Sequence, residues 1–241
     1  MCNRCGDDSH DGTSRRGFMT GAAALGLATI AAPPAFAQQA PQNAITPDEA
    51  LKRIMEGNAR YAANAPQETD FGADRAKKAL GQFPVAGIVS CADSRVAPEI
   101  LFDQGPGDLF VMRVAGNIVN ADNIASLEFG VAVLGIPLIM VLGHTSCGAV
   151  DAAIATVRDK DVLPGHLPRL TEAIRPAVLK ARASDPDDML AAATKANVQH
   201  GMQGVRLGSA IIADAVSAGK VSVVGGVYDL TKGQVIPVNA A

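Results

Sequence analysis

Three soft metal ligands follow two apolar segments of the sequence. Residues 85–89 and 136–142 are short aliphatic runs, typical of buried strands in a parallel sheet. Cys91 comes two residues after the end of the first run, and His144 and Cys147 come after the second. Because the carboxyl ends of parallel strands meet at one edge of an α/β sheet, we expect these side chains to lie together. Two thiolates and one imidazole, with a fourth position free, predict a catalytic zinc site, since calcium and magnesium prefer oxygen ligands.

Two charged residues accompany the first of these ligands. Asp93 and Arg95 follow Cys91 at intervals of two. A fork-like pair between Arg95 and Asp93 would keep the carboxylate ionised and away from the metal. If Arg95 released it, Asp93 would be free to bind zinc as a fourth ligand and close the site. The alternative is a surface salt bridge, worth ~0–1 kcal/mol, but a position just after a strand and a thiolate favours a role in the reaction.

The remaining pattern predicts an α/β fold with a mostly parallel central sheet, covered by helices and ending in a C-terminal hairpin strand. Residues 46–49, Thr-Pro-Asp-Glu, are typical of a helix start. Further helices are expected over 121–134, 147–157, 195–208 and 211–217, and further strands over 110–114 and 221–228, the latter turning into the hairpin. Cys147 would begin one of these helices, where the helix dipole is expected to lower its pKa.

Composition limits the classes of function. The 241 residues suffice for one sizeable domain. A net charge of −3, 4% aromatic residues and no Trp argue against binding to nucleic acid.

The first part of the sequence is typical of an export signal. Residues 14–19, Ser-Arg-Arg-Gly-Phe-Met, resemble the twin-arginine motif, and they precede a mild apolar run over 19–32 and Ala-Phe-Ala at 35–37. We therefore expect 1–37 to be a twin-arginine signal peptide and 38–241 the zinc domain, exported to the periplasm and not membrane-bound after cleavage. A membrane anchor is the alternative, but this run is short for a bilayer. Cys2 and Cys5 with His10 would be an accident of the leader rather than a metal site.

The motifs together carry a family resemblance. Residues 91–95, Cys-Ala-Asp-Ser-Arg, with His144-x-x-Cys147 and the block 107–117 between them, resemble the zinc signature of the β-class carbonic anhydrases. The resemblance covers the chain from about Thr46 to its end, including the C-terminal hairpin. It implies one Zn²⁺ per chain, bound by Cys91, His144 and Cys147, with Asp93 and Arg95 orienting zinc-bound hydroxide. The implied reaction is reversible hydration of CO2 to bicarbonate and a proton.

The same resemblance implies contributions from outside the zinc ligands. Gln82 matches a glutamine that binds substrate in plant-type members of the family; the alternative is an exposed loop residue. The first helix matches one that packs onto a partner subunit, which implies a homodimer or a higher homo-oligomer. The alternative is a helix that covers its own sheet and needs no partner.

Two other functions stay open at this point. The same scaffold also fits hydrolysis of CS2 or COS. A non-catalytic structural zinc protein would normally have four protein ligands, and only Asp93 is near enough in sequence to supply the fourth. His166 and His200 have no cysteine at ligand spacing, and we expect both to face solvent.

Overall fold

The computed structural model describes residues 43, 45–68, 70, 72, 75–160 and 162–240, apart from the side chain of residue 77. The predicted signal peptide and the two cysteines within it lie outside these residues. Within the described part of the chain, no helix is long and apolar enough to cross a membrane.

The core of the fold is a five-stranded sheet with the order β2-β1-β3-β4-β5. Its strands are β1 (Ala86–Ser90), β2 (Leu109–Arg113), β3 (Leu138–His144), β4 (Ser222–Asp229) and β5 (Gln234–Val238). The first four run parallel, and β5 pairs antiparallel with β4 through the predicted hairpin. Every residue of β1 and β3 is buried, as expected of inner strands covered on both faces. The predicted fold class is therefore confirmed.

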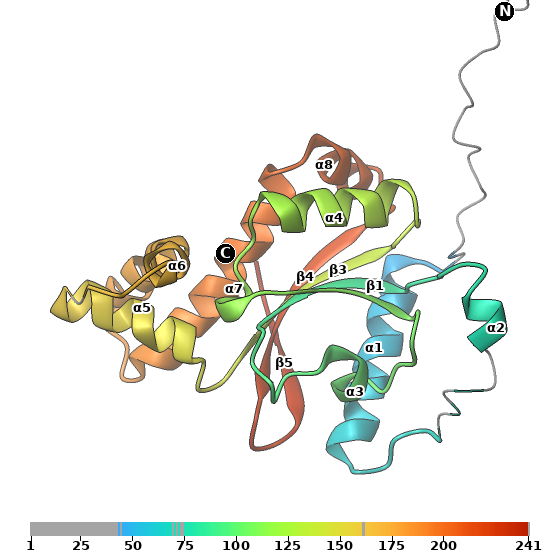
Figure 1. The fold of residues 1–241 in the computed structure, drawn as a ribbon, viewed down its shortest axis with the longest axis horizontal. Coiled ribbons are helices and arrows are strands. Elements are labelled where there is room, and N and C mark those ends of the chain that lie inside the picture. Colours follow the sequence, from blue (N-terminus) through green and yellow to red (C-terminus); the bar gives the residue numbers. More distant parts are fainter. Residues whose placement is uncertain are drawn as a thin grey trace, which may run out of the picture. The chain divides into compact units, whose positions relative to one another are not determined.

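Helices cover both faces of this sheet (Figure 1). One face carries α1 (Pro47–Ala62) and α3 (Pro98–Leu101), and the other carries α4 (Ala121–Ala132), α7 (Met189–Leu207) and α8 (Ala210–Ser217). A third cluster of buried side chains joins α5 (Gly148–Asp159), α6 (Leu167–Arg182) and α7, and it includes Cys91 and Cys147. The remaining short elements are α2 (Arg75–Lys78) and the 3-10 turn η1 (Ala115–Asn117). The two cysteines predicted to bind metal thus lie where the sheet meets the layer formed by α5, α6 and α7.

The first helix begins where the sequence predicts. The Thr46 side chain accepts from the backbone N–H of Glu49, and the Glu49 side chain accepts from the backbone N–H of Thr46, which completes a capping box. Ala50 and Ile54 are fully buried, and they pack in the same core cluster as Ile88 and Leu138 of the sheet. Helix α1 therefore packs against the sheet of its own chain.

Helix α7 packs unusually close to the sheet because glycines face it. A Cβ added to Gly225 on β4 would lie 2.5 Å from the Met202 sulfur, and one added to Gly143 on β3 would lie 2.8 Å from Val198. Both distances are shorter than real contacts allow, so larger residues would force the helix away. This close contact brings the polar side chains of α7 within reach of the strand ends.

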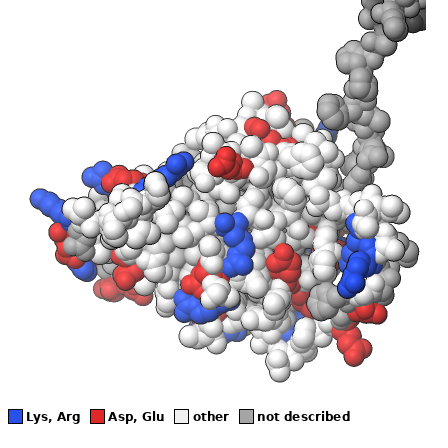
Figure 2. Space-filling model, in the orientation of Figure 1, with Lys and Arg blue, Asp and Glu red and all other residues white. Residues whose placement is uncertain are grey.

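Charged side chains are dispersed over the face shown in Figure 2. Lys and Arg alternate there with Asp and Glu, and large areas carry neither. On this face no single sign of charge forms a field that would steer a large polyanion.

Candidate metal centre

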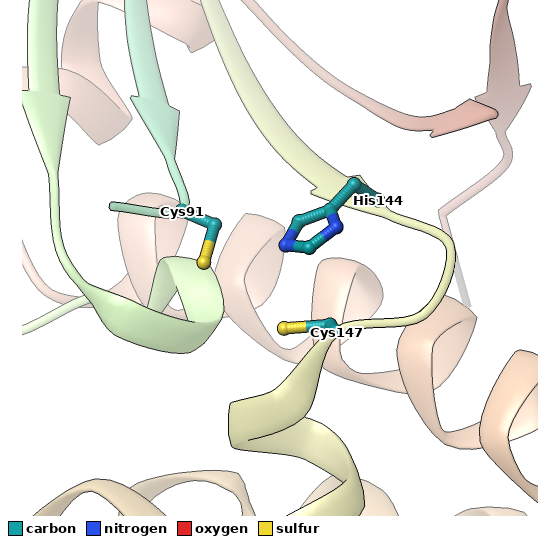
Figure 3. Close-up of side chains that lie close together, drawn as sticks. All are labelled: Cys91, His144 and Cys147. Carbon is teal, nitrogen blue, oxygen red and sulfur yellow. The ribbon is translucent and has the colours of Figure 1, made fainter. Parts of the chain in front are cut away.

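The sheet brings together the three predicted ligands at its carboxyl edge. Cys91 follows β1, His144 ends β3, and Cys147 is the N-cap of α5. The two sulfur atoms and an imidazole nitrogen all lie within 4.8 Å of one another and point toward a common centre (Figure 3). All three residues are buried, with exposed fractions of 4%, 0% and 1%. Among the residues that the structure describes, this is the one group of three or more such ligands placed to hold a metal.

The imidazole of His144 is oriented for a metal. Its Nδ1 lies 2.9 Å from the backbone oxygen of Thr145, an acceptor, so Nδ1 carries the proton. Nε2 then presents its lone pair toward the cysteines, where it is buried and has no hydrogen-bond partner in the protein. Metal-binding histidines typically donate their other N–H to such an oxygen. The unpartnered Nε2 beside two free thiols fits Zn²⁺.

The two thiols differ in their pKa. Hydrogen bonding with Cys147 is the main cause that lowers the pKa of Cys91, and His144 and the backbone N–H groups of Asp93 and Gly116 add to it. Those N–H groups donate to the Cys91 sulfur at 3.4 and 3.3 Å. For Cys147 the same hydrogen bond and burial raise the pKa.

The N–H groups of Ala149 and Val150 at the helix terminus lower the pKa of Cys147, as expected, but they are not the largest influence on that thiol. The neighbouring Cys91 and burial outweigh those N–H groups, so the pKa of Cys147 is raised overall. Cys91 also affects His144: burial opposes the charged form of the imidazole, but the nearby Cys91 sulfur, the Thr145 backbone oxygen and Asp93 raise its pKa overall.

Asp93 and Arg95 form a two-pronged ion pair beside the ligands. Arg95 Nε donates to Asp93 Oδ1 at 2.9 Å, and Nη2 donates to Oδ2 at 2.7 Å. This pairing holds the pKa of the Asp93 carboxyl well below its usual range. The carboxylate oxygen Oδ2 still lies 3.8 Å from His144 Nε2, so Asp93 reaches the edge of the centre without joining it. The guanidinium is more than half exposed, while the carboxylate is mostly covered.

Arg113 is a residue of this site that the sequence analysis did not identify. It ends β2, and its guanidinium donates to the backbone oxygens of Cys91 (3.1 Å) and Asp93 (2.7 Å). These bonds fix the loop that carries both residues. An arginine at the end of a mostly apolar strand was the available signal, because the parallel pairing of β1 with β2 places that end beside Cys91.

Gln82 is not brought to the centre within one chain. It is exposed and precedes β1, whereas Cys91 follows that strand. A five-residue strand is about 16 Å long, so the two residues lie at opposite ends of it. His166 and His200 are exposed, as predicted.

These features define a buried group of two cysteines and one histidine that could bind a metal, with a charged pair at its rim, on a mostly parallel α/β sheet. The model of the family described as "Carbonic anhydrase" matches residues 86–235. "Carbonic anhydrase 2" of Mycobacterium tuberculosis is 40% identical over 194 residues, which cover 79% of this chain and 92% of that protein. The carbonic anhydrase of Mycolicibacterium smegmatis is 39% identical over 193 residues, with 78% and 92% covered.

Solved structures with a similar fold are also carbonic anhydrases of the β class. The Coccomyxa β-carbonic anhydrase, solved in complex with acetazolamide, is 30% identical with a TM-score of 0.61, over 78% of this chain and 86% of that one. The β-carbonic anhydrase CcaA is 26% identical with a TM-score of 0.60, over 78% and 95%. The chain belongs to the carbonic anhydrase family, in its β class, and is an enzyme of that family.

Proposed function

We propose that this enzyme catalyses the reversible hydration of CO2 to bicarbonate and a proton, with one Zn²⁺ per chain held by Cys91, His144 and Cys147. The observation that carries the proposal is the buried ligand group, with its unpartnered His144 Nε2, in a chain of this family. Bound there, zinc would lower the pKa of a coordinated water so that it becomes nucleophilic near neutral pH; carbonic anhydrase is the standard example of this effect, though with three histidine ligands.

The Asp93–Arg95 pair would orient the nucleophile for the reaction. Arg95 keeps Asp93 ionised and turned toward itself, so the carboxylate is available as an acceptor at the rim of the centre. From that position the Asp93 carboxylate would accept a hydrogen bond from the O–H of the nucleophile and so orient it toward CO2. This pairing supports the open arrangement, in which Arg95 holds Asp93 off the metal.

Stopped-flow hydration of CO2, on protein of known zinc content, tests the proposal. We expect turnover that depends on bound zinc and is lost when a chelator removes it. CS2 and COS are assayed beside CO2, since the scaffold alone does not distinguish these substrates. Tightly bound zinc with no turnover of CO2 would overturn the proposal in favour of a structural role, and preferential turnover of CS2 or COS would reassign the substrate.

We also propose that the active form is a homodimer or a higher homo-oligomer. Gln82 lies far from the metal centre of its own chain, so it can serve as a substrate-binding residue only at the centre of another copy. Its neighbours Leu80 and Phe83 are 91% and 52% exposed, and such apolar surface favours burial against a partner.

Replacing Gln82 by Ala tests that role. We expect a reduced kcat/KM for CO2 with zinc content unchanged, because the amide is proposed to contact substrate and not metal. Light scattering on the wild type reports the assembly. A monomeric wild type of full activity would contradict both the assembly and the role of Gln82, and normal kinetics in Gln82→Ala would contradict the role alone.

The final part of the proposal concerns location. We propose that residues 1–37 direct export through the twin-arginine route, which carries folded proteins, and that zinc is bound before export. The geometry of the site gives a reason for binding zinc before export. The Cys91 and Cys147 sulfurs lie within 4.8 Å of one another, so a small movement would bring them to the S–S bond length of about 2 Å. In an oxidising compartment, an oxidised thiol oxidoreductase would accept two electrons from these thiols as two protons leave and the S–S bond forms. Bound zinc would protect both.

Redirecting export tests this order. With Arg15→Lys and Arg16→Lys together, we expect active, zinc-loaded enzyme to stay in the cytoplasm. With a Sec signal in place of residues 1–37, we expect periplasmic protein with less zinc and a fraction of Cys91–Cys147 disulfide. Cell fractionation, metal analysis and thiol counting measure these outcomes. Full export of the double-Lys variant, or full zinc loading of the Sec-routed protein, would refute the proposed link.

A further inference from the structure

A buried amide on α7 contacts the loop that supports a metal ligand. Asn197 is only 3% exposed, and its Nδ2 donates to the backbone oxygen of Gly116 at 2.8 Å. The two residues are 81 positions apart in sequence. Since α7 lies close against the sheet, this contact joins a core helix to the η1 turn that follows β2.

Gly116 in turn contacts the metal ligand Cys91. Its backbone N–H donates to the Cys91 sulfur at 3.3 Å, and both groups are buried. Gly116 has φ +73°, a left-handed conformation that favours glycine. A Cβ at this position would also lie 2.6 Å from Ile174 on α6, so the turn fits tightly between two helices.

We propose that Asn197 is a positioning residue for the Cys91 thiolate. By holding the Gly116 carbonyl, it fixes the conformation of Gly116 and so directs the neighbouring N–H at the sulfur. That N–H stabilises negative charge on the sulfur and sets its direction toward the metal. The inference rests on the proposed zinc site, and it assigns a function to a residue 50 positions beyond the last ligand in the sequence.

Residues that hydrogen-bond to metal ligands, or that hold such partners in place, commonly have a strong effect on metal affinity. Loss of such a partner typically weakens metal binding about 10–100-fold. Without Asn197, the Gly116 oxygen loses its partner, the turn relaxes, and the N–H no longer points at Cys91. The sulfur then has a less defined direction toward the metal.

The test uses Asn197→Leu, similar in volume but unable to donate, and Asn197→Ser, whose hydroxyl is too short to reach Gly116. Thr194→Val is the matched control: Thr194 lies one turn earlier on α7, is 3% exposed, and its hydroxyl has no partner. Zinc affinity is measured by competition with a chelator. The absorption of the cobalt-substituted full-length protein reports the thiolate-to-metal charge-transfer band, which general destabilisation would not shift.

We expect Asn197→Leu and Asn197→Ser to bind zinc about 10–100-fold more weakly and to shift the charge-transfer band, while Thr194→Val matches the wild type. If Asn197→Leu does not fold, Asn197→Ser decides the matter. Unchanged affinity, or weaker affinity with an unshifted band, would overturn the proposal. Both readouts concern metal binding, so a wild type that binds zinc yet fails to hydrate CO2 would refute the proposed reaction and leave this test valid.

Discussion

Removing either member of the Asp93–Arg95 pair is expected to abolish most CO2 hydration while one zinc per chain remains bound. In Asp93→Asn the orienting acceptor loses its charge, and in Arg95→Ala the carboxylate loses the fork that holds it in place. Misplacement of a positioning group by about 1 Å can lower a rate 100-fold, so we expect kcat/KM to fall about 100-fold or more. Stopped-flow kinetics and metal analysis on the same preparations measure the two effects separately.

A second ion pair in the chain provides the matched control. Arg158 and Asp159 make the same fork, at 2.8 and 2.7 Å, on the exposed end of α5. Arg158→Ala should leave kinetics and zinc content at wild-type values. Near-normal turnover in both Asp93→Asn and Arg95→Ala would remove the pair from the reaction. Loss of zinc in Asp93→Asn would instead identify Asp93 as a resting ligand and reject the arrangement in which it stays off the metal.

The gathering of the metal ligands was predictable from local sequence. Cys91 and His144 each end a run of aliphatic residues, and burial of both runs as neighbouring parallel strands leaves only one edge where those ends can meet. Capping residues and glycines likewise marked α1 and the hairpin. These signals work because each depends on residues only a few positions apart.

The residues that support the ligands were not predictable in this way. Arg113 reaches Cys91 across 22 positions, and Asn197 reaches Gly116 across 81. Such contacts depend on how the elements pack, and nothing near an asparagine in a helix indicates which carbonyl it will meet. Helix α6 was also not predicted, since Pro176 interrupts its pattern, although the buried face of Ile174, Ala177 and Val178 stabilises it.

The pKa values of the thiols show the same limit. The position of Cys147 at a helix N-terminus was correctly predicted, but its pKa depends on a group from another strand. Because Cys91 lies beside it, the neighbouring sulfur and burial outweigh the local dipole. Electrostatics at such a site therefore follows from the assembled cluster rather than from any single element.

Replacement of any one ligand is expected to cost the enzyme its zinc. Cys91→Ala, His144→Ala and Cys147→Ala each leave two of the three protein ligands, and we expect occupancy below about one-tenth of the wild type after dialysis against a chelator. A ligand that binds only the folded state stabilises it in proportion to the logarithm of its concentration over Kd. A chelator should therefore lower the Tm of the wild type and leave the Tm of each variant unchanged.

The chelator difference separates loss of metal from loss of packing. An alanine at position 144 also leaves a cavity, which lowers Tm on its own, but that cost is present with and without chelator and cancels in the comparison. Ser90→Ala is the matched control, because Ser90 is fully buried next to Cys91 and its hydroxyl has no partner. It should keep both the zinc and the response to chelator. Full zinc occupancy in Cys147→Ala would exclude that residue from the centre, and the most direct substitute within reach would be Asp93, whose Oδ2 lies 3.8 Å from His144 Nε2.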